Sequence, residues 1–293
     1  GAAVTALTGF QYSLYYAKER PQGRLLSCKD PLSPPVNIIE HSDVKRMLLT
    51  QKAYAEGAYT LCLYGSQLAD DQLTGLSQAA REQAATILDF LTPVIKSWPS
   101  EWGPKANDLA IQVLGGHGYV DEHPVEMFYR DNRLNPIHEG TTGIQSLDLL
   151  CRKVPMNDFS GFCAFIAEIE KTIQASATST SLKTYSQQLD QAVNNLRSTT
   201  EQVFAAAKTK NPDLVFANSV SYLNMVGHIT IAWLWLKQGQ VATKALTQSP
   251  HQSDKDFYQG KLHTMRYFYR SELPDVHAWS KLIRDLDSTN FEM

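Results

Sequence analysis

The stretch Gln112-Val-Leu-Gly-Gly-His-Gly-Tyr119 is decisive for the fold, because a helical pattern ends there in a glycine-rich loop. Residues 106–114 space their apolar side chains as a helix does, and Gly115-Gly116 is a typical helix stop. Glycines allow positive φ and let backbone N–H groups approach phosphate oxygens closely. Taken alone, the loop favours the simpler interpretation of a helix end followed by a tight turn.

A second glycine-bounded turn follows in Ile137-His-Glu-Gly-Thr-Thr-Gly-Ile-Gln145, with an amphipathic helical pattern after it. Thr141 or Thr142 can cap the helix that this pattern predicts. Glu139 has two interpretations. It can complement the positive end of that helix, or it can act as a general base in a pocket where a bound ligand excludes water. If Glu139 is considered by itself, the first interpretation, a residue that complements the helix end, is favoured.

Helical spacing extends outward from these two turns in both directions. The predicted helices cover about residues 4–19, 42–68, 76–95, 106–114, 144–154, 159–175, 183–208, 214–238, 255–272 and 275–285. Residues 21–37 and 176–181 are rich in loop-forming residues, and Pro99–Pro104 is expected to break a helix. No segment alternates polar and apolar residues as a strand does.

Pro155-Met-Asn-Asp158 is the best candidate for an internal boundary. The sequence therefore predicts an all-α protein of two units. The first is a four-helix-type bundle over residues 1–155, and the second is a smaller helical domain over residues 158–293.

Composition excludes several classes of function. Charged residues make up 19% and the net charge is −3, which argues against a nucleic-acid or polybasic membrane surface. The longest apolar run, Ile229–Leu236, is far shorter than the roughly 20 residues of a membrane span. The four cysteines have no C-x-x-C spacing, and the opening residues do not form a secretory signal. We therefore expect reduced thiols and a cytoplasmic protein.

A polar cluster in and after the glycine loop is a conceivable metal site. It contains His117, Asp121, Glu122, His123 and Glu126. Glu122 and Glu126 lie one helical turn apart, but no set of these residues has the spacing of a tetrahedral site. A solvated loop and helix start is the favoured interpretation, and no metal is expected.

The two turns together, at this separation, are far more specific than either alone. Gln-x-x-Gly-Gly-x-Gly-Tyr, then Arg-Asp, then Glu-Gly-Thr-Thr-x-Ile-Gln resembles the C-terminal helical domain of the acyl-CoA dehydrogenase family. Tyr16–Arg24 is similar to another segment of that family. Residues 38–58 and the size of 158–293 resemble a larger branch with an extra C-terminal helical domain, which includes 3-methylmercaptopropionyl-CoA dehydrogenase.

The resemblance implies a role for individual residues. Glu139 matches the base that removes the α-proton of an acyl-CoA thioester, and Gly140 matches a residue beside the thioester. The positions that match contacts to the cofactor FAD are Arg20, Gln112, Val113, Leu114, Gly115, Gly116, Thr141, Thr142 and Gly143. In this family FAD accepts a hydride from the β-carbon, while the protein supplies position and electrostatics.

The same resemblance implies fatty acid β-oxidation chemistry, a homodimer, and electron transfer to an electron-transfer flavoprotein. The helical pattern begins at once after Gly1, and the family's N-terminal helical and β domains are not recognised in the sequence. We therefore expect a fragment with an incomplete FAD site, inactive by itself. The alternative is a helical dimerisation or assembly module derived from the same family.

Overall fold

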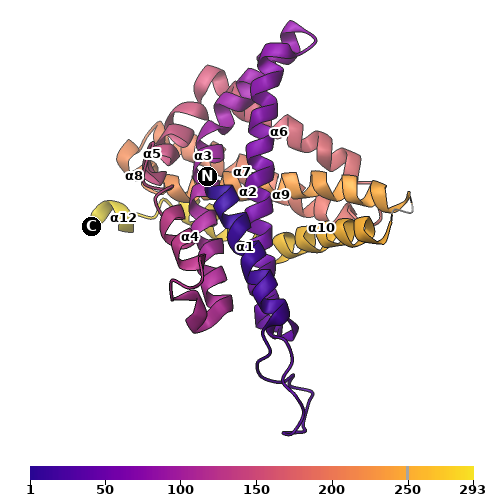
Figure 1. Cartoon of the computed structure of the whole chain (residues 1–293). Helices are drawn as coiled ribbons and strands as arrows, with labels where there is room; N and C mark the ends of the chain where they lie inside the picture. The colour runs from indigo at the N-terminus through magenta and orange to yellow at the C-terminus, as the bar shows by residue number, and fades with distance from the viewer. Residues whose placement is uncertain (249–250) are drawn as a thin grey trace. The chain divides into compact units, whose positions relative to one another are not determined.

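The computed structural model describes residues 1–248 and 251–293, and the all-α prediction is confirmed. Within those two ranges the backbone forms helices, turns and one isolated antiparallel bridge, between Pro21 and Asn37, with no strand. The chain divides into two compact units, residues 1–59 with 99–138, and residues 60–98 with 139–293. The long helices α2 (Ser42–Thr74) and α3 (Gln78–Leu114), which are labelled in Figure 1, contribute residues to both units.

The first unit packs α1 (Ala2–Glu19) and α4 (Val125–Asn132) against each other and against the parts of α2 and α3 that belong to it. Its core is made of small and apolar side chains: Phe10, Ala17, Ile38, Met47, Leu48, Ala110, Val113, Leu114 and Val125. Two fully buried asparagines join its helices, since Asn132 donates to Asn107 over 2.7 Å and Asn107 donates to the Thr5 carbonyl over 3.1 Å. These amides satisfy each other away from water.

The predicted loop 21–37 forms a narrow excursion between α1 and the short 3₁₀ helix η1 (Ile38–Glu40). Its two arms are joined by backbone hydrogen bonds from Gln22 to Val36 and from Val36 to Gly23. Gly23 has φ +72°, a backbone conformation that residues other than glycine rarely adopt. The arms therefore return the chain close to the end of α1.

The second unit is built around α9 (Ser219–Leu246). Every residue from Ile229 to Leu236 is buried, so this apolar run lies in the core of the unit. Helices that contact α9 include α5 (Thr142–Leu147), α6 (Met156–Ser176), α7 (Lys183–Ala207), α10 (Gln252–Ser271), α11 (Asp275–Arg284) and the π-helical segment η3 (Asp148–Lys153). Trp98 of α3 also donates a hydrogen bond to His228 of α9. Two single-turn helices, α8 (Pro212–Val215) and α12 (Thr289–Glu292), complete the unit, and 3₁₀ segment η2 (Gly115–Gly118) belongs to the first.

The predicted helix break at Pro99–Pro104 is wrong, because α3 runs unbroken from Gln78 to Leu114. A proline inside a helix costs about 3 kcal/mol, since it removes one backbone hydrogen bond and crowds the preceding turn. Both proline rings are buried here, as are Trp98 and Trp102. Burial of these large side chains offsets the local cost, so tertiary packing overrides the proline signal.

The predicted helix at 214–238 is also different in the structure. It is divided into α8 and α9, and α9 extends to Leu246. No helix of the described residues is both long enough and apolar enough to cross a bilayer. The predicted boundary at 155–158 coincides with a kink, where Asn157, Asp158 and Phe159 all have left-handed backbone conformations.

Candidate functional site

The turn before α5 has an unusual backbone. Glu139 has φ +55° and the following Gly140 has φ +86°. The left-handed region costs a residue with a Cβ atom about 1 kcal/mol or more, and strain of this kind gathers at functional sites. The glutamate side chain is exposed. The residue singled out from sequence as a base therefore occupies a backbone conformation that its own side chain disfavours.

Two side chains hold the carbonyl groups of this turn. Lys96, on α3, donates a hydrogen bond from Nζ to the Gly140 carbonyl oxygen over 2.7 Å. Gln145, on α5, donates from Nε2 to the Glu139 carbonyl oxygen over 3.1 Å. Hydrogen-bond donors on α3 and α5 thus hold the turn in place.

The threonines after Gly140 lie at the start of α5. Thr141 is the N-cap residue by position, but its side chain makes no capping hydrogen bond, and Thr142 and Gly143 open the helix. The buried Ser146 donates to the Gly143 carbonyl over 2.8 Å and lies 3.0 Å from Ser219 Oγ, at the start of α9. The residues Glu139–Gly143 therefore form one short segment that is anchored on the buried helix α9.

The glycine-rich loop follows the C-terminal end of α3, in the first unit. Val113 and Leu114 are buried, so they can offer a ligand only their backbone groups. Gly115 has φ +61°, and a Cβ placed on Gly115 or Gly116 would meet no atom within 4 Å. Open space of this kind next to backbone N–H groups suits an anion such as a phosphate.

Arg20 is exposed at the C-cap of α1. Its carbonyl accepts a hydrogen bond from the Ile38 backbone over 2.8 Å, which fixes the end of the helix. Tyr16, one turn earlier, lies with its hydroxyl 2.9 Å from Nδ1 of His117. This contact joins the end of α1 to the glycine loop within the first unit.

The structure therefore gathers the predicted residues into two groups. Arg20 and Gln112–Gly116 belong to the first unit, whereas Glu139–Gly143 belong to the second. Among the described residues no cluster of His, Cys, Asp and Glu has the arrangement of a metal site. His117 and His123, weighed as ligands from sequence, instead stack on each other and bond to Tyr16 and Tyr12.

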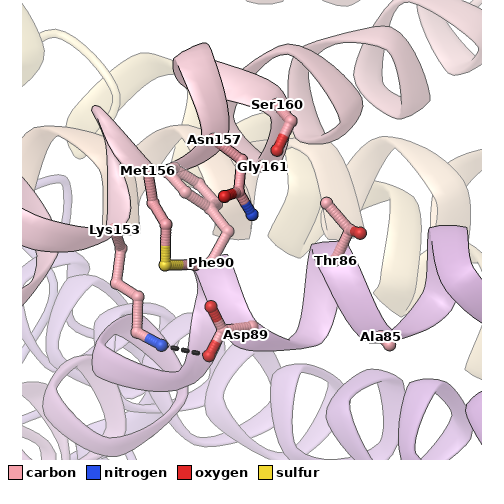
Figure 2. Close-up of a pocket in the computed structure, with 9 residues that line it drawn as sticks. All are labelled: Ala85, Thr86, Asp89, Phe90, Lys153, Met156, Asn157, Ser160 and Gly161. Carbon is pink, nitrogen blue, oxygen red and sulfur yellow. Dashed lines mark hydrogen bonds and ion pairs between the residues drawn. The ribbon is translucent and has the colours of Figure 1, made fainter.

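A pocket of about 220 Å³ lies beside the left-handed turn at the start of α6. Figure 2 shows that it is lined from α3 by Asp89 and Phe90 and from the opposite side by Lys153, Met156 and Asn157. Lys153 is buried and forms an ion pair with Asp89, drawn as a dashed line (Figure 2). This pair ties α3 to the segment between α5 and α6.

A larger pocket, of about 500 Å³, lies elsewhere in the second unit. Lys237 reaches into it with its ammonium 5.1 Å from the ring centres of both Tyr64 and Trp233. Burial lowers the pKa of Lys237, and burial raises the pKa of Tyr64. None of the residues singled out from sequence lines this pocket.

Sequence reasoning missed Lys96, and it quoted Gln145 within the motif without giving it a role. Gln145 could have been suspected, because it lies six residues after the base in the same motif. Lys96 gives no such signal, because it precedes the turn by more than forty residues and lies inside a long helix.

Two domain families together match most of the chain. Residues 28–153 match the family described as "Acyl-CoA dehydrogenase, C-terminal domain". Residues 165–293 match the family described as "Acetyl-CoA dehydrogenase C-terminal like".

Curated relatives align along the whole chain. It is 30% identical over 299 residues to the broad-specificity linear acyl-CoA dehydrogenase FadE5 of Mycobacterium tuberculosis, covering 100% of this chain and 49% of that protein. It is 32% identical over 290 residues to 3-methylmercaptopropionyl-CoA dehydrogenase of Ruegeria pomeroyi, covering 97% of this chain and 47% of that protein. The chain thus spans about half the length of these relatives.

Solved structures show the same fold. An acyl-CoA dehydrogenase from Bacillus anthracis, complexed with FAD, superposes with a TM-score of 0.73 at 18% identity, covering 96% of this chain and 47% of that one. Caenorhabditis elegans ACDH-11, in complex with C11-CoA, also superposes with a TM-score of 0.73 at 18% identity, covering 99% of this chain and 45% of that one.

Proposed function

Because the chain belongs to the acyl-CoA dehydrogenase family, we propose that it carries the catalytic base and part of the FAD site of an enzyme that oxidises acyl-CoA thioesters. The product is the 2,3-enoyl-CoA, formed by loss of an α-proton and a β-hydride. The observation that carries the proposal is Glu139, held at φ +55° in a fastened turn at the position that the family motif assigns to the base.

In this proposal the Glu139 carboxylate takes the α-proton. The α-proton of a thioester is a weak acid, so the base must be fixed at the reacting carbon. Gly140 leaves the backbone next to the base without a side chain, so a thioester can approach it closely. The exposed position of Glu139 leaves its carboxylate accessible to a substrate.

FAD, when bound, supplies the acceptor for the β-hydride. The open space at Gly115 and Gly116 fits a group with phosphate oxygens, and Gln112, Val113 and Leu114 lead into that loop. We propose that these residues and Arg20 hold the diphosphate side of FAD. Thr141, Thr142 and Gly143 are proposed to contact FAD beside the base.

Other features of the family are proposed for the whole protein. They are a homodimer, electron transfer to an electron-transfer flavoprotein, and a cytoplasmic place in β-oxidation. We also propose a first domain over residues 1–155 and a second over 158–293. The two matched families support this division, because they end at 153 and begin at 165 and the left-handed kink at 157–159 lies between them.

The test compares Glu139→Gln with Glu201→Gln in the full-length protein, assayed with an acyl-CoA and an artificial electron acceptor. Both variants lose one carboxylate, but Glu201 is an exposed residue of α7. Loss of a general base is expected to reduce kcat by about 100-fold or more. Full activity in Glu139→Gln would refute the base assignment, and an inactive parent protein would favour the alternative of an assembly module.

A further inference from the structure

We infer that Lys96 and Gln145 are positioning residues for the base, which hold the two carbonyl groups of the Glu139–Gly140 turn in place. The inference rests on the proposed function, because it concerns how the proposed base is oriented. It adds two residues, from α3 and α5, whose side chains act through the backbone of the turn.

The turn has an unfavourable backbone conformation. Two successive left-handed residues are unfavourable when the first of them carries a Cβ atom, as Glu139 does. Such a conformation persists only where surrounding groups determine it. The carbonyl groups of these two residues are the ones that accept from Gln145 and Lys96.

The hydrogen bond from Lys96 Nζ to the Gly140 carbonyl oxygen is strong for its kind. An ammonium donor forms shorter and stronger hydrogen bonds than a neutral donor, and 2.7 Å is a typical length for such a bond. Lys96 is only partly exposed. Its bond to the Gly140 carbonyl oxygen is therefore less weakened by solvent than a bond at the surface would be.

The Gln145 amide also fills the space beside Gly140. A Cβ built on Gly140 would lie 2.8 Å from Gln145 Nε2, which is closer than real contacts of this kind. The amide occupies the space that the missing side chain leaves, and from there it reaches the Glu139 carbonyl oxygen. Glycine at 140 and glutamine at 145 therefore serve one arrangement.

The functional consequence concerns the direction of the base. Rotation about the backbone bonds of Glu139 swings its Cα–Cβ bond and moves the carboxylate away from the α-carbon. A displacement of about 1 Å at a reacting group can reduce a rate by about 100-fold. Lys96 and Gln145 act on backbone oxygens, so they position the base without themselves taking the proton.

The experiment uses the full-length holoenzyme and four variants. Lys96→Met and Gln145→Leu remove a donor while keeping most of the side-chain volume, and Lys96→Arg keeps a charged donor. Lys281→Met is the matched control, because Lys281 is an exposed lysine of the same unit, paired only at the surface with Asp285. Steady-state kinetics, thermal unfolding and hydrogen–deuterium exchange of residues 139–143 are measured for each.

We expect Lys96→Met and Gln145→Leu to lower kcat by about 10- to 100-fold, with KM changed by less than about 3-fold. Backbone exchange at 139–143 should become faster in both, Lys96→Arg should recover part of kcat, and Lys281→Met should match the parent. Lower thermal stability with unchanged kcat and unchanged local exchange would overturn the inference. So would full kcat in both donor variants when Glu139→Gln is inactive, an outcome that leaves the proposed function intact.

Discussion

The ammonium nitrogen of Lys96 lies 2.7 Å from the carbonyl oxygen of Gly140, and this bond joins the middle of α3 to the turn that carries Glu139. The two central residues of the turn, Glu139 and Gly140, are both left-handed. Their carbonyl groups accept hydrogen bonds from Gln145 on α5 and Lys96 on α3.

Gly140→Ala should destabilise the second unit and disturb the base turn. The new Cβ would meet Gln145 Nε2 at 2.8 Å, and alanine at φ +86° is strained whatever the space. We expect the free energy of unfolding to fall by about 1–3 kcal/mol, as measured by urea denaturation. Gly260→Ala is the control, because Gly260 lies inside α10 with nothing within 4 Å of an added Cβ. That variant should gain up to about 1 kcal/mol, and an equal loss in both would contradict the explanation.

Two glycines of the loop should have separable effects. A Cβ on Gly118 would lie 2.5 Å from the Ile111 carbonyl oxygen, whereas one on Gly116 would meet nothing within 4 Å. Gly118→Ala should therefore cost about 1–3 kcal/mol of stability. Gly116→Ala should leave stability within about 0.5 kcal/mol and weaken FAD binding to the full-length protein, as measured by fluorescence titration. Unchanged FAD affinity in Gly116→Ala would count against a role for the loop in binding FAD.

The stability of the fold should respond unequally to removal of Lys153 and of Asp89, because only Lys153 of this ion pair is buried. Lys153 is buried, whereas the Asp89 side chain is 42% exposed. Asp89→Asn leaves an ammonium without its carboxylate in a buried place, so we expect a loss of about 3 kcal/mol. Lys153→Met removes the buried charge itself and should cost less. Urea denaturation of both single variants and of the double variant measures the coupling, and equal losses would refute this asymmetry.

Alkaline pH should destabilise the fold through its buried tyrosines. Burial raises the pKa of Tyr269, whose hydroxyl donates to the Ala232 carbonyl over 3.0 Å, and burial also raises the pKa of Tyr222. An unfolded tyrosine loses its proton near pH 10 while these two stay neutral, so stability is full below about pH 10 and falls above it. Tyr269→Phe should lose about 1 kcal/mol at pH 7 and show a smaller further loss at pH 11 in urea titrations. An unchanged pH dependence would contradict this origin.

Sequence patterns predicted some helix ends closely, because the helices expected to end at 114 and 175 end at Leu114 and Ser176. The run at Ile229–Leu236 is helical as expected and is buried on every side. The prediction failed at Pro99, because a local proline rule cannot register the burial of Trp98 and Trp102 on either side. The candidate residues were found because their motifs are contiguous. Lys96 was missed because its partner, Gly140, is distant in sequence.

The sequence by itself determined the all-α class, the family, and the identity of the proposed base, because amphipathic spacing and glycine-bounded motifs are written in consecutive residues. Tertiary structure alone decided that α3 continues through its prolines, that Glu139 is left-handed, and that Lys96 fastens the turn. The physical reason is that these features depend on packing and hydrogen bonds between segments far apart in the chain. No local propensity encodes such contacts.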